Sequence, residues 1–515
     1  MLSRSPYPYG YKGGKFPIAV DLANENIRVD KNINLSSNNP YSWAIDFAFL
    51  TLVLGALLFI ALGHRPLFVP DEGRYAEIAR EMVATHDYII PHLNGIQYFE
   101  KPILFYWMTA LAIKLFGLNI WSVRSVNACL AWLGILWTYF TARQLYDRKT
   151  GLLSAFIMGT SLLYFVMARM VSLDLSVTVF LSISLYAILL NRQNPKQHYY
   201  LWIASISSAA AVLTKGLIGI VFPILIVSIW LMISKSPGIK RSQLLICSFI
   251  FLVITLPWHL LAAIKHHEFF YYYFIYQQFL RYTTPGIGHL QPNWFFIPII
   301  LIGFLPWSIF LLQTLIHHFH RKQPVDIFFL LWIGIVFVFF SFSKSKLIPY
   351  ILPIFPPLAI LTAHYLTSKN VLGKKNTILL SLLSILLCLS TTFYFLPHLD
   401  TRTILPLATQ LKPLLQSEDE VISYNQYYQD LPFYLERRIT VLNWHGELDF
   451  GTHYQDTKKW MINNQDFLNR LNSNRHLYIL INKNDYQQLV KNYPKNKFYT
   501  LGKAYKNLLV SNQPL

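Results

Sequence analysis

Apolar runs of about 20 residues, the length that a helix needs to span a bilayer, recur between residues 44 and 396. A soluble core does not need such runs, so the sequence predicts a polytopic α-helical membrane protein with about 11 to 13 transmembrane helices. Polar residues precede the first run, which we therefore expect to be a retained span and not a cleavable signal peptide. The spans are expected near residues 44–63, 121–142, 150–167, 172–190, 199–213, 216–233, 243–264, 293–316, 325–342, 347–366 and 376–396.

The loops between these spans alternate in charge. Cytoplasmic loops are rich in lysine and arginine, and every second loop of this chain is basic. The basic residues of these loops are Arg143, Arg148, Lys149, Arg192, Lys196, Lys235, Lys240, Arg241, Arg321, Lys322, Lys369, Lys374 and Lys375. The apolar stretch 102–117 is short and carries Lys114; as a full span it would place all of these loops outside. We therefore expect a cytoplasmic N-terminus and a helix at 102–117 that lies at the interface.

The net charge of +19 does not require a nucleic-acid partner. Basic cytoplasmic loops and their contacts with anionic headgroups account for it, so we expect membrane lipids as partners and no nucleic acid. The three cysteines, Cys129, Cys247 and Cys388, lie in apolar runs without metal-ligand spacing, and no structural disulfide is expected.

Three regions follow from this pattern. Residues 1–41 are expected to be a cytoplasmic tail, and residues 42–396 a transmembrane domain whose first outer loop is 64–120. Residues 397–515 are no longer membrane-like and predict a small α/β domain on the outer face. Its expected strands are 421–424, 439–442 and 477–481, with a helical turn at 485–490.

A charge-dense segment follows the first span directly. It reads Pro70-Asp71-Glu72-Gly73-Arg74-Tyr75-Ala76-Glu77-Ile78. Charges at a membrane boundary are costly and tend to be functional. Asp71 is therefore a candidate catalytic acid, although an N-cap of a solvated helix would explain the same residue.

Further outer-face motifs supply a second acid and several cations. Asp174 in Ser172-Leu173-Asp174 begins a span, so it is either a second acid or an N-cap. In Glu100-Lys101, Lys101 suits a lipid phosphate and Glu100 suits orienting that lysine or holding a metal; a snorkelling ion pair is the alternative. Lys215 is either a ligand or a snorkelling anchor.

The remaining cations lie in two later outer loops. Arg281 can bind phosphate with its planar fork, whereas His266, His267 and His289 lack zinc spacing. Lys344 and Lys346 break the positive-inside trend, which an anionic substrate at the outer face would explain. A carboxylate can take a proton from an acceptor hydroxyl, and cations can stabilise a departing phosphate. Because no nucleotide-binding motif is present, we expect a lipid-phosphate donor.

In their order along the chain these motifs resemble the GT-C glycosyltransferases, in particular the lipid A aminoarabinose transferase (ArnT-like) branch, which is related to protein O-mannosyltransferases. The resemblance covers about residues 44–396. It is carried by Pro70-Asp71-Glu72-x-Arg74-Tyr75-Ala76-Glu77-Ile78, Tyr98-Phe99-Glu100-Lys101-Pro102, Ser172-Leu173-Asp174, Leu213-Thr214-Lys215-Gly216, Ser343-Lys344-Ser345-Lys346-Leu347 and Pro353-x-x-Pro356-Pro357.

The resemblance implies an inverting enzyme of the bacterial inner membrane that uses an undecaprenyl-phosphate sugar at the periplasmic side. It implies Asp71 and Asp174 as catalytic acids, and Glu100 as a candidate ligand of a divalent metal ion, with no other cofactor expected. Relatives tend to carry Glu-His where this chain has Gln277-Gln278, so the second metal ligand is missing. The expected substrate-binding residues are Arg74, Tyr75, Glu100, Lys101, Lys215, Arg281, Lys344, Lys346 and Tyr350.

The sequence therefore favours transfer of a sugar, for example 4-amino-4-deoxy-L-arabinose, from undecaprenyl phosphate to lipid A or a similar envelope acceptor. Transfer to protein or to another glycan is the alternative within the same class. A lipid or sugar transporter is a third interpretation, but transporters place broken helices near the middle of the membrane, whereas the unusual charges here gather at one face.

Overall fold

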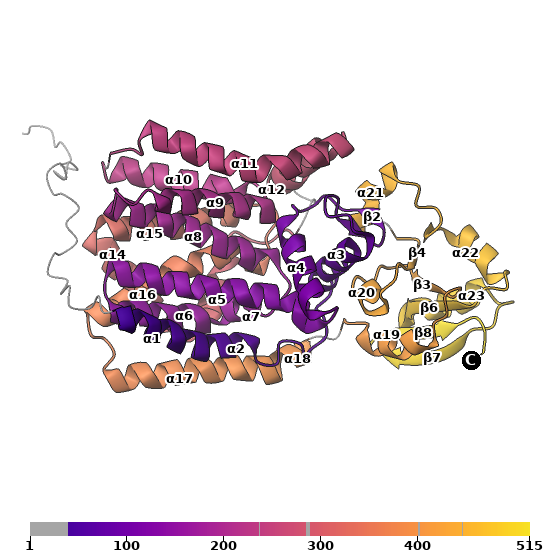
Figure 1. The fold of residues 1–515 in the computed structure, drawn as a ribbon. Helices are drawn as coiled ribbons and strands as arrows, with labels where there is room; N and C mark the ends of the chain where they lie inside the picture. The colour runs from indigo at the N-terminus through magenta and orange to yellow at the C-terminus, as the bar shows by residue number, and fades with distance from the viewer. Residues whose placement is uncertain (1–39, 236, 285–288, 400–401, 445, 515) are drawn as a thin grey trace, which may run out of the picture.

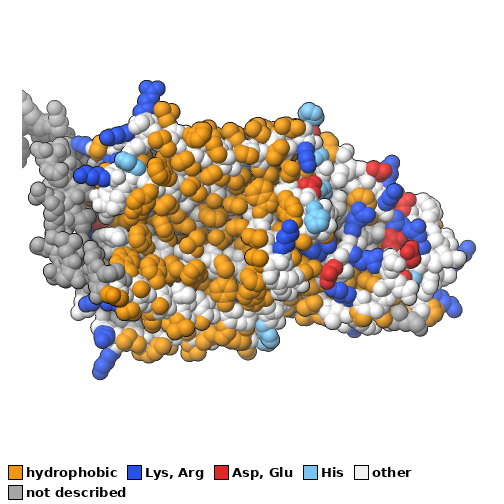
Figure 2. Space-filling view, viewed as in Figure 1, with side chains coloured by type: hydrophobic (Ala, Val, Ile, Leu, Met, Phe, Trp, Pro, Cys, Tyr) orange, Lys and Arg blue, Asp and Glu red, His pale blue; other side chains and the backbone are white. Residues whose placement is uncertain are grey.

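The computed structural model describes residues 40–235, 237–284, 289–399, 402–444 and 446–514. The expected tail 1–41 lies outside these ranges except for its last two residues. A helical bundle forms one part of the molecule, and a mixed sheet covered by short helices forms the other, with α3 and α4 between them (Figure 1). Figure 2 shows hydrophobic side chains over the flank of the bundle and charged side chains gathered at its ends and on the sheet part.

Within the described residues, seven helices are long and apolar enough to cross a membrane, or nine if each of two bent pairs is one span. The seven are Tyr41–Phe59, α5 (Ile120–Leu145), α8 (Leu173–Gln193), α11 (Arg241–Lys265), α15 (Pro324–Phe342), Ile348–Ser368 and Lys374–His398. Three of these are composite, built from α1 (Pro40–Leu50), η2 (Thr51–Gly55) and α2 (Ala56–Phe59); η5 (Ile348–Ile354) and α16 (Phe355–Ser368); and α17 (Lys374–Ser390), η6 (Thr391–Phe395) and α18 (Leu396–Leu399).

Two expected spans, 150–167 and 293–316, are each broken by a sharp bend. The first is α6 (Arg148–Thr160) with α7 (Leu162–Ala168), bent by 66°, and the second is α13 (Phe296–Gly303) with η4 (Trp307–Phe310) and α14 (Leu311–Arg321), bent by 112°. The two bends lie against each other. The Leu162 N–H donates to the carbonyl of Leu305 at 3.3 Å, and a Cβ at Gly303 would lie 2.8 Å from the side chain of Leu163.

The other two expected spans form helices that are shorter than a full crossing. They are α9 (Tyr199–Lys215), with 17 residues, and α10 (Ile218–Ile233), with 16 residues. Together with the nine they make up the eleven expected positions. The long loop after α11 folds into η3 (Tyr271–Leu280), a π-helix, and α12 (Arg281–Thr283).

The segment between the first and second spans lies at the end of the bundle that faces the sheet (Figure 1). It contains α3 (Asp71–Thr85), a hairpin of β1 (His92–Leu93) and β2 (Ile96–Gln97), and α4 (Leu104–Phe116). α4 is a short apolar helix of 13 residues, as expected for the stretch 102–117.

The C-terminal part is a six-stranded mixed sheet in the order β5-β4-β3-β6-β8-β7. The strands β3, β4, β5 and β6 are parallel, and β8 and β7 continue the sheet antiparallel. Its strands are β3 (Glu420–Tyr424), β4 (Thr440–Leu442), β5 (Met461–Ile462), β6 (Leu477–Asn482), β7 (Tyr499–Ala504) and β8 (Asn507–Ser511). Its helices are α19 (Leu405–Leu411), η7 (Lys412–Leu414), α20 (Leu431–Leu435), η8 (Gly446–Leu448), α21 (Asp449–Tyr454), α22 (Asn464–Leu471) and α23 (Lys483–Asn492).

The sheet buries both of its faces, because successive side chains of a strand point to opposite sides. On β3, Val421 faces the core that also holds Ala76 and Phe105 from α3 and α4. The next residue, Ile422, faces a second core that contains Phe467 and Leu489 from α22 and α23. The three expected strands and the helical turn at 485–490 are confirmed, and one face of the sheet shares a core with the first loop.

Candidate active site

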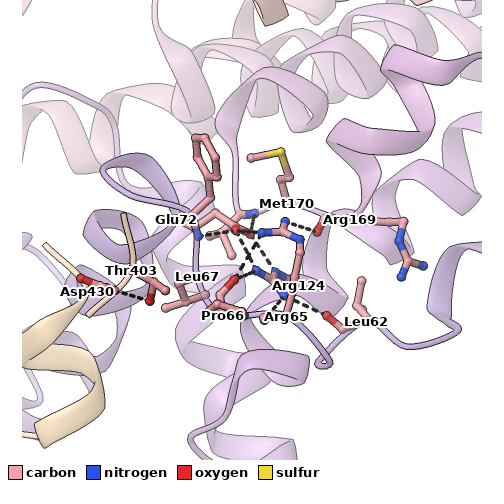
Figure 3. Close-up of polar contacts among 12 residues, drawn as sticks. Leu62, Arg65, Pro66, Leu67, Glu72, Arg124, Arg169, Met170, Thr403 and Asp430 are labelled. Atoms are coloured by element: carbon pink, nitrogen blue, oxygen red, sulfur yellow. Dashed lines mark hydrogen bonds and ion pairs between the residues drawn. The ribbon is translucent and has the colours of Figure 1, made fainter. Parts of the chain in front are cut away.

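A fully buried carboxylate organises the first turn of α3 (Figure 3). Glu72 forms ion pairs with Arg65 at 2.9 Å and Arg124 at 2.8 Å, and it accepts the backbone N–H groups of Phe68 and Val171, both at 2.8 Å. Burial alone raises the pKa of Glu72, but Arg124 and Arg65 hold it at about 2. Three separate chain segments are thereby tied to one side chain.

Asp71, one residue earlier, has a different environment. Its side chain is 52% exposed, and its one ion pair is with Arg74 at 3.6 Å. Arg74 is buried and forms a shorter pair, of 2.5 Å, with Glu447 from the C-terminal part. The carboxylate of Asp71 is therefore open to an incoming group while its position is limited by Arg74.

Glu100 lies next to the predicted phosphate ligand Arg281. The hydroxyl of Tyr98 donates to Glu100 at 3.0 Å, and Arg281 approaches the same carboxylate oxygen at 3.8 Å. Arg281 also donates to the side chain of Gln277 at 3.2 Å. Neither contact is a short bidentate pair, which leaves guanidinium N–H groups able to meet an anion.

Lys101 lies among these charges. The groups that act on it electrostatically are Arg281, Glu100, Lys215 and Asp174, so the structure brings together residues that are far apart in the sequence. Burial, and then repulsion by Arg281, lowers the pKa of Lys101 from 10.5 to about 7. A lysine in this state gains a partner, and recovers its charge, when a phosphate binds.

Asp174 and Lys215 form a second pair on the same side of the bundle. Asp174 begins α8, where Ser172 caps the helix by accepting the Asp174 N–H. The carboxylate of Asp174 is paired with the ammonium of Lys215, which lies 4.2 Å from the centre of the Tyr350 ring. Both carboxylates, Asp71 and Asp174, act electrostatically on buried Tyr75, so Tyr75 is near enough to both acids to sense their charge.

The last two predicted cations differ from each other. The Lys344 side chain is exposed, and its backbone N–H donates to the carbonyl of Tyr282, the residue after Arg281, at 3.0 Å. Lys346 is buried, and its ammonium donates to the carbonyls of Gln291 at 2.8 Å and Ser343 at 2.7 Å. Lys346 thus holds its own loop, and its substrate contact stays a prediction.

A cavity of about 550 Å³ opens beside Arg281, between η3 and the segment η8–α21. Its charged lining is mainly acidic. The lining side chains that can carry charge are Glu100, Glu268, Arg281, Glu447, Asp449 and His453. Aromatic rings form much of the remaining wall, and one pair of them, Tyr272 and Phe450, stacks across the two sides with centroids 3.8 Å apart.

The surroundings of Glu100 do not fit the metal ion that the resemblance implies. Among the residues that the structure describes, its hydrogen-bond and ion-pair partners are the Tyr98 hydroxyl and Arg281, and neither supplies a second carboxylate, imidazole or thiolate ligand. Within the described residues, the group of three side chains close enough to share a metal is His317, His318 and His364. Those rings are engaged elsewhere: His318 contacts Asp326 at 2.8 Å and a backbone carbonyl, and Arg321 contacts His364 at 2.9 Å.

Sequence reasoning missed two residues of this region. Arg124 is an ionisable residue inside an apolar run, a signal that marks a buried charge with a partner. Glu447 carries no such signal, because its importance arises only when the C-terminal part packs against α3.

Two family models match the chain. The model for dolichyl-phosphate-mannose-protein mannosyltransferase matches residues 48–273, and the model for the aminoarabinose transferase C-terminal domain matches residues 407–512. The first covers the spans and loops that carry Asp71, Lys101 and Asp174, and the second covers the sheet.

Curated relatives match about two thirds of the chain. An undecaprenyl phosphate-α-4-amino-4-deoxy-L-arabinose arabinosyl transferase from Proteus mirabilis is 34% identical over 345 residues, which are 65% of this chain and 61% of the relative. A protein of the same description from Pseudomonas aeruginosa is 29% identical over 332 residues, 64% of this chain and 60% of the relative. The matched part thus spans less than two thirds of each relative's length.

The crystal structure of ArnT from Cupriavidus metallidurans bound to undecaprenyl phosphate has a TM-score of 0.81 to this structure. The match is 24% identical in sequence and covers 92% of this chain and 98% of that chain. The fold is therefore that of the GT-C glycosyltransferases. A family model matches each of the two parts of that fold.

Proposed function

We propose that this protein is an inverting glycosyltransferase that moves 4-amino-4-deoxy-L-arabinose from undecaprenyl phosphate to lipid A or a similar envelope acceptor. The observation that carries the proposal is the position of Asp71, whose half-exposed carboxylate lies on the same side of the bundle as the cations Lys101 and Arg281. An acid for the acceptor and cations for a phosphate are the groups that such a transfer requires.

The reaction assigns one task to each group. The acceptor oxygen attacks the anomeric carbon of the sugar. Asp71 either takes the proton of the acceptor hydroxyl or orients that hydroxyl. The bond between the anomeric carbon and the phosphate oxygen breaks, and the electron pair leaves with undecaprenyl phosphate. Arg281 and Lys101 stabilise the charge that builds on the leaving phosphate, and the pair Asp174–Lys215 supports this cationic side.

The acidic lining of the cavity supports an amino sugar as the group transferred. Glu447, Asp449 and Glu268 surround the space beside Arg281, and a sugar that carries an ammonium group would pair with such carboxylates. The described relatives are named for the same amino sugar.

The proposed location is the bacterial inner membrane, with the cavity facing the periplasm. The basic loops described from the sequence lie at the end of the bundle away from the sheet, where Figure 2 shows lysine and arginine side chains. The positive-inside rule then assigns that end to the cytoplasm, and the sheet, α3 and α4 to the periplasm.

Transfer to protein is the second candidate, because the family model over residues 48–273 is described as a protein mannosyltransferase. Mass spectrometry of lipid A separates the two. We expect an amino-pentose mass that is present with the wild-type gene and absent both without it and with Asp71→Asn. Lipid A that is the same in all three strains would refute lipid A as the acceptor and would direct the search to glycoproteins.

A further inference from the structure

The C-terminal sheet is joined to the first loop by hydrogen bonds that involve the main chain. The side-chain amide of Asn94 donates to the carbonyl of Ile439 at 3.0 Å, and its oxygen accepts the Ile439 N–H at 2.9 Å. The Leu67 N–H donates to the hydroxyl of Tyr434 at 2.8 Å. Because a backbone group that loses such a partner in a buried place is penalised, these bonds favour one fixed arrangement of the two parts.

Two glycines make the contact closer than other residues would allow. A Cβ at Gly73, in the first turn of α3, would lie 2.7 Å from the backbone nitrogen of Asp430. A Cβ at Gly451, in the C-terminal part, would lie 2.6 Å from the carbonyl oxygen of Gln97. One glycine comes from each side, so the surfaces are fitted to each other at two separate points.

This packing carries Glu447 into the candidate active site. Its carboxylate pairs with Arg74 at 2.5 Å, and the two side chains are only 12% and 13% exposed. Gln429 donates to the second oxygen of Glu447 at 3.3 Å. On the other side Arg74 faces Asp71 at 3.6 Å, so the charges run in the order Glu447, Arg74, Asp71.

We infer that Glu447 is a positioning residue for sugar transfer: it holds the guanidinium of Arg74 and thereby keeps the carboxylate of Asp71 open to the acceptor. The inference rests on the proposed function, in which Asp71 acts on the acceptor. The C-terminal domain is then a part of the active site and not an accessory, since it supplies the side chain that fixes Arg74.

The physical reason is competition between two carboxylates for one arginine. A planar guanidinium forms its strongest contact as a bidentate pair with a carboxylate. While Glu447 occupies Arg74, the contact to Asp71 stays long. Without Glu447, Arg74 would close on Asp71 and engage the oxygens that the acceptor needs. Burial raises the pKa of Glu447 and Arg74 opposes this rise, which is consistent with mutual dependence of the two charges.

The test measures sugar transfer by the full-length protein from an undecaprenyl-phosphate amino sugar to lipid A in detergent. The variants are Glu447→Gln, Arg74→Ala and the double substitution. In the wild-type background we expect Glu447→Gln to lower kcat about 10- to 100-fold, because small displacements of reacting groups have effects of this size, with little change in the KM for the donor. In the Arg74→Ala background the same substitution should change kcat less than about twofold, since coupled residues are not additive.

Glu436→Gln is the matched control. It makes the same chemical change in the same domain and also removes an ion pair, that with Lys412 at 2.5 Å, but on the exposed surface. We expect it to keep the wild-type kcat. Glu447→Asp, which retains a carboxylate, should recover part of the activity that Glu447→Gln loses.

Two results would overturn the inference: a kcat for Glu447→Gln within about twofold of wild type, or equal effects of the substitution in both backgrounds. Thermal unfolding of the same four proteins gives a second measurement that needs no activity. If Arg74 and Glu447 interact, the Tm shifts of the two single variants should not add up to that of the double variant. Additive shifts would contradict an interaction between the two side chains. If the wild type transfers no sugar but the Tm values are coupled, the proposed function fails and the ion pair stands.

Discussion

Asp71 and Glu72 are adjacent in the sequence and begin the same helix, yet their carboxylates lie in opposite environments. Glu72 is fully buried and bound by two arginines and two backbone N–H groups. Asp71 is half exposed, with one long contact to Arg74. The first arrangement satisfies a charge completely, and the second leaves a charge available for another molecule.

The difference separates structural from chemical roles within one motif. Glu72 gains nothing from a substrate, because its acceptor positions are already used, whereas Asp71, Lys101 and Arg281 can all gain a partner. A charge-dense motif at a membrane boundary therefore needs to be divided residue by residue before roles are assigned.

The largest effect expected from this comparison is that of Asp71→Asn on transfer. Loss of a general base lowers rates about 10²- to 10⁴-fold, and the exposed position predicts a change in Tm of less than about 2 °C. Steady-state kinetics and a thermal melt on the same preparation measure both. A variant with full activity would remove Asp71 from the mechanism.

The counterpart is Glu72→Gln, which should act on stability. It leaves Arg65 and Arg124 buried without a counter-charge, and breaking a buried pair in this way costs about 3–5 kcal/mol. We expect a low yield of folded protein and a clearly lowered Tm. Equal stability of this variant and wild type would show that the Glu72 cluster does not brace the fold.

Protonation gives a second check on the same carboxylate. Because the folded pKa of Glu72 is depressed to about 2 from 4.5, its contribution to stability is complete above pH 4.5 and is lost as the pH falls towards 2. Acid unfolding of the wild type should therefore show a component in that range that Glu72→Gln lacks.

Among the cations, Arg281→Gln should weaken binding of the donor more than binding of the acceptor. Hydrogen bonds to a charged group contribute about 1.5–3 kcal/mol, which corresponds to an increase of about 10- to 100-fold in the Kd for undecaprenyl phosphate. Isothermal titration with undecaprenyl phosphate measures this Kd, and Arg321→Gln, at the C-terminal end of α14, is the control. An unchanged Kd would exclude Arg281 as a phosphate ligand.

The smallest effect is the pH dependence that Lys101 should confer. Its pKa of about 7 means that the ammonium is charged below pH 7 and loses its proton above it, so undecaprenyl phosphate should bind about tenfold more weakly at pH 8 than at pH 6. Lys101→Arg, which stays charged, should abolish this dependence. Identical pH profiles of the two proteins would contradict the role.

The lowered pKa of Lys101 should also affect the stability of the fold, in the direction opposite to its effect on donor binding. Between pH 7 and 10.5 the unfolded chain binds more protons than the folded chain at Lys101. Stability should therefore rise with pH over that range through this residue, while donor binding falls.

Much of the fold could be predicted from the sequence, because long apolar runs have few alternatives to spanning helices. The runs at 150–167 and 293–316 gave the correct positions but not the bends of 66° and 112°, since those depend on contacts between the two broken helices. The strand β8 was missed although Asn507–Ser511 is fully buried, because a run of five residues does not distinguish a strand from a buried loop.

The candidate site was predictable where the charge itself was unusual. Asp71, Lys101 and Asp174 stand out at a membrane boundary, and the structure brings Lys101 and Asp174 together. Lys346 stands out equally in the sequence, but its ammonium donates to two backbone carbonyls near its own loop. The sequence does not show this contact, because it depends on the geometry of the loop. Glu447 could not be found, because only tertiary packing gives it a partner.

The N–H of Val171 bound to Glu72 has a further consequence for motion. It links the start of α3, which bears Asp71, to the turn that leads into α8 and Asp174, so a buried hydrogen bond couples the positions of the two segments that carry the acids. η3 (Tyr271–Leu280), which lines the cavity beside Arg281, is a π-helix, a form that is uncommon and recurs at functional sites.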